Sequence, residues 1–176
     1  MSINSKEFVE NPEPLTMRRC IGRFLTGVAV VTADSDEEQV GMTINSLNSI
    51  SLDPPILMIS LNFGTRTTDA IESRDAFAIS ILRTKQEAVA RQFATAGGAR
   101  FEVGNFDTLP SGIPVVSEAL AQFGCEVIEK NTVGDHRVFF GKVTHCRDQD
   151  GSALSFNGGQ FGEFRSFGHD PIPWHA

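Results

Sequence analysis

Apolar residues near the N-terminus recur at spacings of three and four positions, which is the period of a helix with one buried face. The set consists of Met17, Cys20, Ile21, Phe24 and Leu25. Thr16 can cap such a helix at its start, and Gly27 can end it. We therefore predict a helix between Thr16 and Gly27 whose apolar face packs on another surface.

Short runs of β-branched, aromatic or alternating apolar residues follow, and they predict strands. The runs span residues 28–33, 56–61, 76–82, 121–129, 136–146 and 153–156. Residues 63–74 predict a loop that leads into a short helix, and Thr84 to Glu87 match a capping box before another helix. Helices do not separate the strands regularly, which disfavours a doubly wound parallel sheet. The pattern favours a mostly β fold with flanking helices, namely a small and mostly antiparallel barrel.

The alternation fails in one stretch, GMTINSLNSISLDPP at residues 41–55. Alternate side chains of a half-buried strand share a face, so the even positions of this stretch should all be apolar. Ser46 and Asn48 interrupt that face, and the opposite face also carries small polar residues such as Thr43 and Asn45. These side chains can form local turns, or they can face a ligand.

Composition narrows the possible functions. The 176 residues suffice for one domain with a substantial core, and the net charge of −7 with scattered Lys and Arg argues against nucleic-acid binding. No apolar run approaches the ~20 residues of a membrane span, and the N-terminal segment lacks the features of a signal peptide. We therefore expect a cytoplasmic protein. Its three cysteines lack a metal-binding spacing and are expected to be small buried residues.

The common nucleotide-binding fingerprints are absent, because no GxGxxG follows a predicted strand and no GxxxxGK[ST] occurs. A bound cofactor would depend on hydroxyls, amides and helix N-termini instead. Residues 41–55 offer such groups, and so does NFGTRTT at residues 62–68, where Thr65, Arg66 and Thr67 stand just before a helix. The threonines can simply cap that helix, whereas a phosphate would use the hydroxyls and the Arg66 guanidinium together.

Three ordered blocks of sequence resemble the flavin reductase family. They are TGVAVVTA, then GMTINSLNSISLDPPILMISL, and then ALAQFGCEVIE followed by GDHRVFFGKV. The resemblance implies a split β-barrel, FMN-binding fold over a domain at residues 16–165, with tails at residues 1–15 and 166–176. It also implies a homodimer that holds FMN or FAD in a groove and takes NADH or NADPH as the second substrate.

In the family, segments that match these polar stretches contact the flavin. The flavin-binding residues that the resemblance implies in the first segments are Thr43, Ile44, Asn45, Ser46, Ser49, Ser60, Leu61 and Asn62. Thr65, Arg66 and Thr67 are implied to hold the flavin phosphate. Arg100 and Phe101 fall where the family often has a basic residue and Phe near the cofactor. On this interpretation the alternation fails because side chains face a ligand.

The Gly134-Asp135-His136 turn resembles the family motif whose histidine meets the nicotinamide, which makes His136 the implied catalytic residue. The implied nicotinamide-binding set is His136, Gly158, Gly159 and Phe161. Gln160 and Phe161 stand where the family commonly has a basic residue and Tyr, so the choice between NADH and NADPH stays open. Hydride transfer between two cofactors needs no catalytic triad and no metal. His145, His169 and His175 are expected to be surface or tail residues.

The leading hypothesis is an NAD(P)H:flavin oxidoreductase that supplies reduced flavin to a partner monooxygenase. The alternative is a flavin-binding or flavin-storage protein of the same fold without nicotinamide turnover, which would not require His136 or the Gly158-Gly159 turn. A structural or interaction domain that binds no flavin is a third reading, and it predicts a colourless protein after incubation with FMN and FAD.

Overall fold

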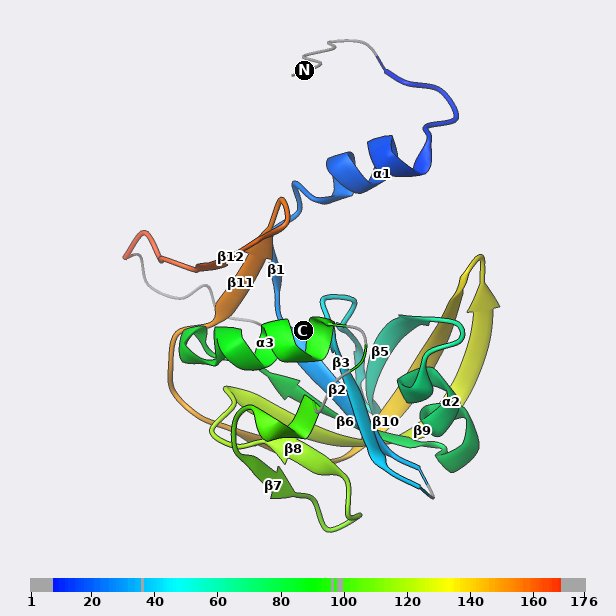
Figure 1. Ribbon diagram of the computed structural model, residues 1–176, viewed down its shortest axis with the longest axis vertical. Coiled ribbons are helices and arrows are strands. Elements are labelled where there is room, and N and C mark those ends of the chain that lie inside the picture. The colour runs from blue at the N-terminus through cyan, green and yellow to red at the C-terminus, as the bar shows by residue number, and fades with distance from the viewer. Residues whose placement is uncertain (1–7, 36, 96, 98–99, 169–176) are drawn as a thin grey trace.

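A computed structural model describes residues 8–35, 37–95, 97 and 100–168 of the chain. Its centre is a seven-stranded sheet in the order β3-β2-β6-β9-β10-β5-β4, in which every neighbouring pair is antiparallel (Figure 1). The strands of this sheet are β2 (Ala29–Asp34), β3 (Gln39–Ile44), β4 (Asn48–Leu52), β5 (Pro55–Asn62), β6 (Ala76–Ile81), β9 (Ala121–Val133) and β10 (His136–Asp148). The predicted mostly β, antiparallel fold is confirmed, and β9 and β10 extend beyond their predicted ranges.

Two smaller sheets flank the large one. The first joins β1 (Thr26–Gly27), β11 (Leu154–Asn157) and β12 (Gln160–Glu163), and the second joins β7 (Phe106–Thr108) and β8 (Pro114–Val116). Among these five strands the sequence pattern predicts only β11. The other four have two to four residues each, which is too short for an alternation of apolar and polar positions to be recognised.

Strand β2, which lies between β3 and β6, is buried on both faces. The side chain of Val31 packs in one apolar cluster with Phe77 and Phe139, whereas that of Val30 packs in another cluster with Phe93. Alternate side chains of a strand point to opposite faces, so a strand covered on both sides needs apolar residues at nearly every position. This explains the nearly continuous apolar run VAVVTA.

Two helices cover the sheet beside β2 and β3. They are α2 (Arg66–Arg74), which the sequence predicts, and α3 (Glu87–Ala94), which follows a 3₁₀ turn at Thr84–Gln86. A second 3₁₀ turn spans Arg100–Glu102. The buried residues of α3 are Val89, Ala90 and Phe93. They belong to the second apolar cluster, through which the helix packs against the sheet.

The predicted capping box before α3 uses different residues from those expected. The side chain of Gln86 accepts a hydrogen bond from the Arg83 N–H (3.1 Å). Thr84, the expected cap, instead donates its hydroxyl to the carbonyl of Ser152 (3.1 Å). The prediction of a cap at Thr84 is therefore wrong, because that hydroxyl bonds to a segment far along the chain.

The polar stretch at residues 41–55 is not one strand. It contains β3 and β4, which lie at opposite edges of the large sheet, and residues 45–47 connect them. Within this connection, Ser46 Oγ donates to the Ser60 carbonyl (2.8 Å) and accepts the Ser60 N–H (3.2 Å). The failure of the alternation therefore marks the passage of the chain from one edge of the sheet to the other.

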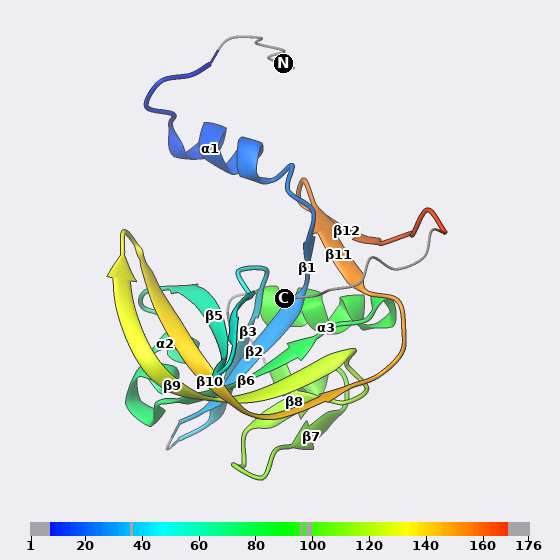
Figure 2. The same cartoon turned by 180° about the vertical axis from the view of Figure 1, so that it is seen from behind.

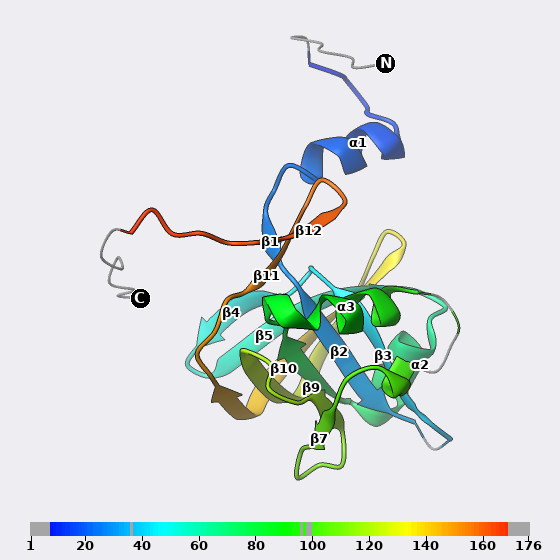
Figure 3. The same cartoon turned by 60° about the vertical axis from the view of Figure 1, so that its left-hand side comes forward.

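The N-terminal helix α1 (Pro14–Ile21) differs from its prediction. It begins after Glu13 and not at a Thr16 cap, since Pro at the first position already has a helical φ. Gly27 does not end it, because that residue lies in β1. No residue of α1 is buried, and the helix stands apart from the sheet in three views (Figures 1, 2 and 3). Within the described residues the apolar face of α1 is uncovered, so the prediction that this face packs on another surface stays a prediction.

Residues 14–27 are called the arm below. The arm is held at its C-terminal end by the β11–β12 hairpin, where the Gly158 N–H donates to the Gly22 carbonyl (2.8 Å) and Asn157 Nδ2 donates to the Arg23 carbonyl (3.1 Å). The predicted domain start at residue 16 falls inside α1, and the division of the chain into residues 16–165 and two tails stays a prediction.

All three cysteines are free thiols. Cys125 is buried as predicted, and burial raises the pKa of its thiol to about 12. Cys20 and Cys146 are exposed, so the expectation that they are buried is wrong. Among the described residues, no helix has the length and apolar character needed to cross a membrane.

Candidate functional site

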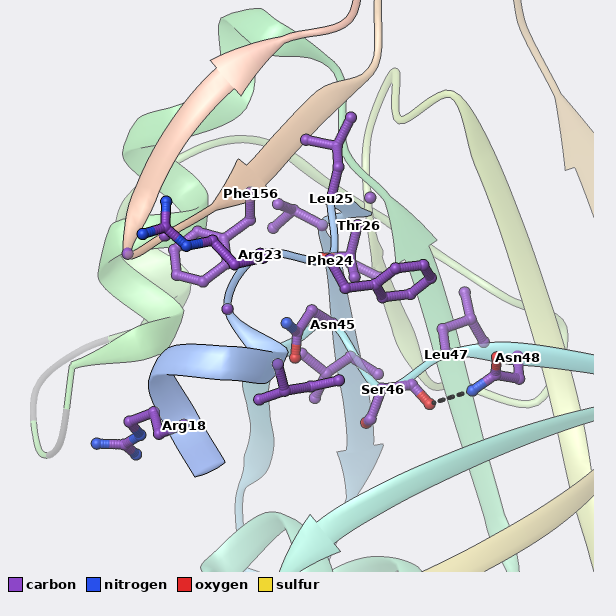
Figure 4. Close-up of a pocket in the computed structure, with 18 of the residues that line it drawn as sticks. Arg18, Arg23, Phe24, Leu25, Thr26, Asn45, Ser46, Leu47, Asn48 and Phe156 are labelled. Carbon is purple, nitrogen blue, oxygen red and sulfur yellow. Dashed lines mark hydrogen bonds between the residues drawn. The ribbon is translucent and has the colours of Figure 1, made fainter. Parts of the chain in front are cut away.

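A cavity of about 1250 Å³ lies between the arm and the connection of β3 to β4. Arg23, Phe24 and Leu25 line it from the arm, and Asn45 and Ser46 line it from the connection (Figure 4). The turn between β11 and β12 contributes Gly158 and Gly159. Ile44, Asn45, Ser46, Gly158 and Gly159 are the predicted site residues that this cavity brings together. Its size and mixed lining suit a flavin or a dinucleotide.

Hydroxyls of the polar stretch are partly engaged within the protein. Thr43 Oγ1 donates to the Ala90 carbonyl of α3 (2.7 Å), and Thr43 does not line the cavity. The Ser46 hydroxyl makes the two hydrogen bonds to Ser60 already described. Asn48 Nδ2 donates to the Ser46 carbonyl (3.3 Å; Figure 4). Hydrogen bonds within the protein therefore account for part of the polar composition, and the bond from Asn48 to Ser46 is of the local kind that the turn-forming alternative predicts.

A second cavity, of about 280 Å³, brings together Arg66, Arg100 and Phe101 with Glu38. Arg66 Nη1 donates to Glu38 Oε1 at 2.6 Å. Arg100 donates to the carbonyls of Gly41 and Thr95, the latter at 3.2 Å. Burial lowers the pKa of the Arg100 guanidinium and the nearby charge of Arg66 lowers it further, while Glu38 opposes the shift. Two cations therefore share this cavity with one bonded carboxylate.

Arg66 is the first residue of α2, so its side chain starts at the N-terminus of that helix. Thr65 is the N-cap, and its Oγ1 accepts the Thr68 N–H (3.1 Å), so the capping role proposed for these threonines is confirmed for Thr65. Thr67 is fully buried, and in the described part of the chain its hydroxyl has no hydrogen-bond partner. A phosphate could reach this hydroxyl only after neighbouring side chains move.

The predicted residues of β5 lie on different faces of their strand. The Leu61 side chain belongs to the buried core, whereas Ser60 is half-buried and Asn62 is exposed. Antiparallel pairing of β5 with β10 places His136 opposite Asn62. Ser49 is exposed on the edge strand β4, away from both cavities. The site predictions thus fall into separate groups, and the role of each residue stays a prediction.

His136 is the half-buried first residue of β10. Its Nδ1 lies 2.6 Å from a carboxylate oxygen of Asp135. That hydrogen bond lowers the pKa of the exposed Asp135 carboxyl, with a smaller contribution from the charge of the ring. An ionised carboxylate can only accept, so Nδ1 carries a proton, and in the neutral form of the ring Nε2 can accept a hydrogen bond. His145 is exposed on the same strand, and His169 and His175 lie outside the described residues.

Phe161 of β12 packs against Phe156, with ring centroids 5.4 Å apart. The Arg91 guanidinium lies 5.0 Å from the centroid of the Phe161 ring, which is the geometry of a cation–π contact. Phe156 lines the larger cavity. Phe161 therefore reaches that cavity only through its neighbour.

Sequence reasoning missed several residues of both cavities. Glu38 stands in the acidic turn DSDEE, where a carboxylate looks like ordinary surface charge. Arg23 and Phe24 were expected to be part of the helix, yet they lie in the turn that follows α1 and line the larger cavity. No local pattern distinguishes these residues, because the cavities form between segments distant in sequence.

Comparison with known proteins identifies similar sequences along most of the chain. The flavin reductase like domain matches residues 21–165. The chain is 36% identical to the FMN reductase (NADH) SmoA of Agrobacterium fabrum, with 85% of each protein covered. It is 35% identical to an NADH-dependent flavin reductase of a Rhodococcus species, with 92% of each covered.

Solved structures show the same similarity. The NADH:FAD oxidoreductase SgcE6 of Streptomyces globisporus, in complex with NAD and FAD fragments, superposes with a TM-score of 0.87 at 31% identity, covering 93% of this chain and 99% of that chain. The nitrilotriacetate monooxygenase component B homologue of Mycobacterium thermoresistibile superposes with a TM-score of 0.85 at 29% identity, covering 92% of each chain.

Proposed function

The chain belongs to the flavin reductase family, and on this premise we propose that it transfers hydride from NADH or NADPH to FMN or FAD and supplies the reduced flavin to a partner monooxygenase. The observation that carries the proposal is the superposition, over nearly the whole chain, on a relative described as an NADH:FAD oxidoreductase with NAD and FAD fragments bound. Related sequences include the reductase component of a 4-nitrophenol monooxygenase of Rhodococcus opacus. This similarity supports a monooxygenase as the partner that receives the reduced flavin.

The donor groups of the second cavity suit a flavin phosphate. Arg66 and Arg100 provide cationic donors, and the N-terminus of α2 adds the positive end of a helix dipole. The unpaired buried hydroxyl of Thr67 is a polar group that still lacks a partner. Thr65, Arg66 and Thr67 would hold the phosphate, and the polar residues at 43–49 and 60–62 would lie along the rest of the flavin.

When bound, the nicotinamide supplies the hydride and the flavin accepts it, so the protein contributes orientation and electrostatics. The Asp135 carboxylate fixes the proton of His136 on Nδ1. Nε2 can then accept a hydrogen bond, and a nicotinamide carboxamide N–H is a suitable donor for it. Gly158, Gly159 and Phe161 form the proposed remainder of the dinucleotide site.

Replacing His136 tests the proposed chemistry. We expect His136→Ala to lower nicotinamide-dependent flavin reduction at least severalfold, because the ring positions the dinucleotide, while the affinity for FMN stays nearly unchanged. Steady-state kinetics and flavin titration measure the two quantities, and His145→Ala on the same strand is the matched control. Equal loss of flavin affinity and turnover would contradict the role of His136. A wild-type protein that binds flavin without NADH or NADPH turnover would instead be a flavin-storage protein.

We also propose a homodimer, on the strength of the arm. Its exposed apolar side chains are Leu15, Met17, Ile21, Phe24 and Leu25. An isolated helix of eight residues is marginal in water, and a contiguous exposed apolar surface is typical of an interface. A second copy of the chain would cover this surface.

The three free thiols are typical of a reducing compartment, and they support the cytoplasm as the place of action.

A further inference from the structure

The cavity between α2 and the 3₁₀ turn at Arg100–Glu102 has an unusual charge arrangement. Arg66 and Arg100 line it together with Glu38 and Glu102, and the charge of Arg66 is close enough to disfavour the protonated form of Arg100. Arg100 cannot easily turn away, because its guanidinium is tied to the carbonyls of Gly41 and Thr95. Two guanidinium groups held in this way favour an anion between or beside them.

Glu38 already supplies a carboxylate to this place. Its Oε1 accepts a hydrogen bond from Arg66 Nη1 at 2.6 Å, and its charge also acts on Arg100. The backbone of Glu38 is fixed by Ser35: the Ser35 N–H and Oγ both donate to the Glu38 carbonyl (2.9 and 2.8 Å), and the Glu38 N–H donates to Ser35 Oγ (3.0 Å). The turn therefore holds the carboxylate beside Arg66 before β3 begins.

The ion pair is accessible and can be exchanged. The side chains of Arg66 and Glu38 are 55% and 46% exposed, and exposed pairs of this kind are weak. A phosphate ester carries up to two negative charges and three acceptor oxygens, so it interacts with the same guanidinium more strongly than a single carboxylate does. Glu38 can thus be displaced from Arg66, but its displacement costs part of the binding energy.

We propose that Glu38 is an internal competitor for the flavin phosphate, which occupies Arg66 when flavin is absent and lowers the affinity for phosphorylated flavins. The proposal rests on the proposed function, because it assumes that Arg66 contacts the phosphate. It assigns a use to the ion pair in a protein that must release its flavin: a carboxylate that returns to Arg66 favours departure of the ligand.

The isosteric change Glu38→Gln tests the proposal. It removes the charge and keeps the backbone hydrogen bonds to Ser35. We expect the affinity for FMN to rise about two- to fivefold, the size of an exposed ion pair, while the affinity for riboflavin stays unchanged because it has no phosphate. Flavin fluorescence titration at low ionic strength measures both ligands, and the gain should shrink in ~1 M salt, where the screening length is about 3 Å.

Glu37→Gln is the matched control, since it makes the same charge change one residue away. Glu37 is exposed, and its carboxylate forms no ion pair with the described residues. We expect no selective gain for FMN in this variant. An equal gain in both variants would reduce the effect to general charge and overturn the proposal, and so would an unchanged or weaker FMN affinity in Glu38→Gln.

Arg66→Ala separates the two levels of the argument. It should weaken FMN about tenfold and leave riboflavin unchanged, and Glu38→Gln should give no further gain in its background. If Arg66→Ala weakens both ligands equally or neither, the phosphate site itself is wrong. If Arg66→Ala weakens FMN selectively and Glu38→Gln does not tighten it, the phosphate site stands and the competitor role is wrong.

Discussion

The large sheet and the arm differ in how far their apolar side chains are buried. Phe77, Phe139 and Phe93 of the sheet and its covering helix are at most 1% exposed, whereas Phe24 and Ile21 of the arm are 69% and 56% exposed. Most apolar residues of the sheet are buried within one chain, although Ile50 and Leu52 of β4 and Ile128 and Val133 of β9 are exposed, whereas the arm buries none of its large apolar residues. This difference indicates that the sheet stabilises the single chain, and it is the basis of the proposal that a second copy covers the arm.

The largest effect is expected from the sheet. Phe139→Ala removes a fully buried ring from the main cluster, and we expect the free energy of unfolding to fall by about 3–5 kcal/mol. Urea denaturation followed by circular dichroism measures this change. Phe167→Ala, at a ring that is 96% exposed, is the control and should change the free energy by about 0.5 kcal/mol or less. A loss below about 1 kcal/mol in Phe139→Ala would show that the cluster is not the stabilising core.

A second prediction concerns the arm. Met17→Glu combined with Ile21→Glu places two charges on its apolar face, and we expect the dissociation constant of the dimer to rise at least about a hundredfold. Light scattering after size exclusion should then report one 19.2 kDa chain in place of two, while the unfolding of the sheet is unchanged.

Arg18→Gln with Arg19→Gln makes the same change in net charge on the same helix, and this control should remain a dimer. A wild-type protein that is already monomeric at micromolar concentration would refute the interpretation of the arm as an interface between copies.

The smallest expected effect lies where the arm meets the β11–β12 hairpin. Phe161→Ala removes the ring that Arg91 covers and that packs on Phe156. We expect the KM for NADH to rise about three- to tenfold, because this hairpin forms the proposed dinucleotide site, and the FMN dissociation constant to stay constant. Phe164→Ala, at an exposed ring after β12, is the control. A change in FMN affinity alone would place Phe161 in the flavin site instead.

The sequence predicts the sheet well because its strands are recognisable from local pattern. VAVVTA and AFAISIL are nearly continuous apolar runs, interrupted only by Thr32 and Ser80, and both become strands covered on two faces. The local pattern is less informative at Met17 and Ile21. Their helical spacing predicts an apolar face correctly, but periodicity cannot tell whether the surface that covers this face belongs to the same chain.

Prediction of the candidate site was limited for a related reason. Arg66, Arg100 and Phe101 do meet in one cavity, although 34 residues separate the two arginines in the numbering of the chain. Their partner Glu38 was not predicted, since an ion pair across 28 positions leaves no local signal. Thr67 was expected to hold a phosphate or to cap the helix, yet α2 turns it into the interior, because the exact start of a helix decides which residues its first turn buries.

The connection at residues 45–47 has a mechanical consequence for the sheet. Outer strands of an open sheet usually fray independently, since each has a neighbour on one side only. Here three residues connect the two edge strands, β3 and β4, and Ser46 attaches this connection to β5 through its two hydrogen bonds to Ser60. Detachment of β3 from the sheet would displace the start of β4 as well. We therefore expect the amide protons of both edge strands to exchange with deuterium in a single opening event.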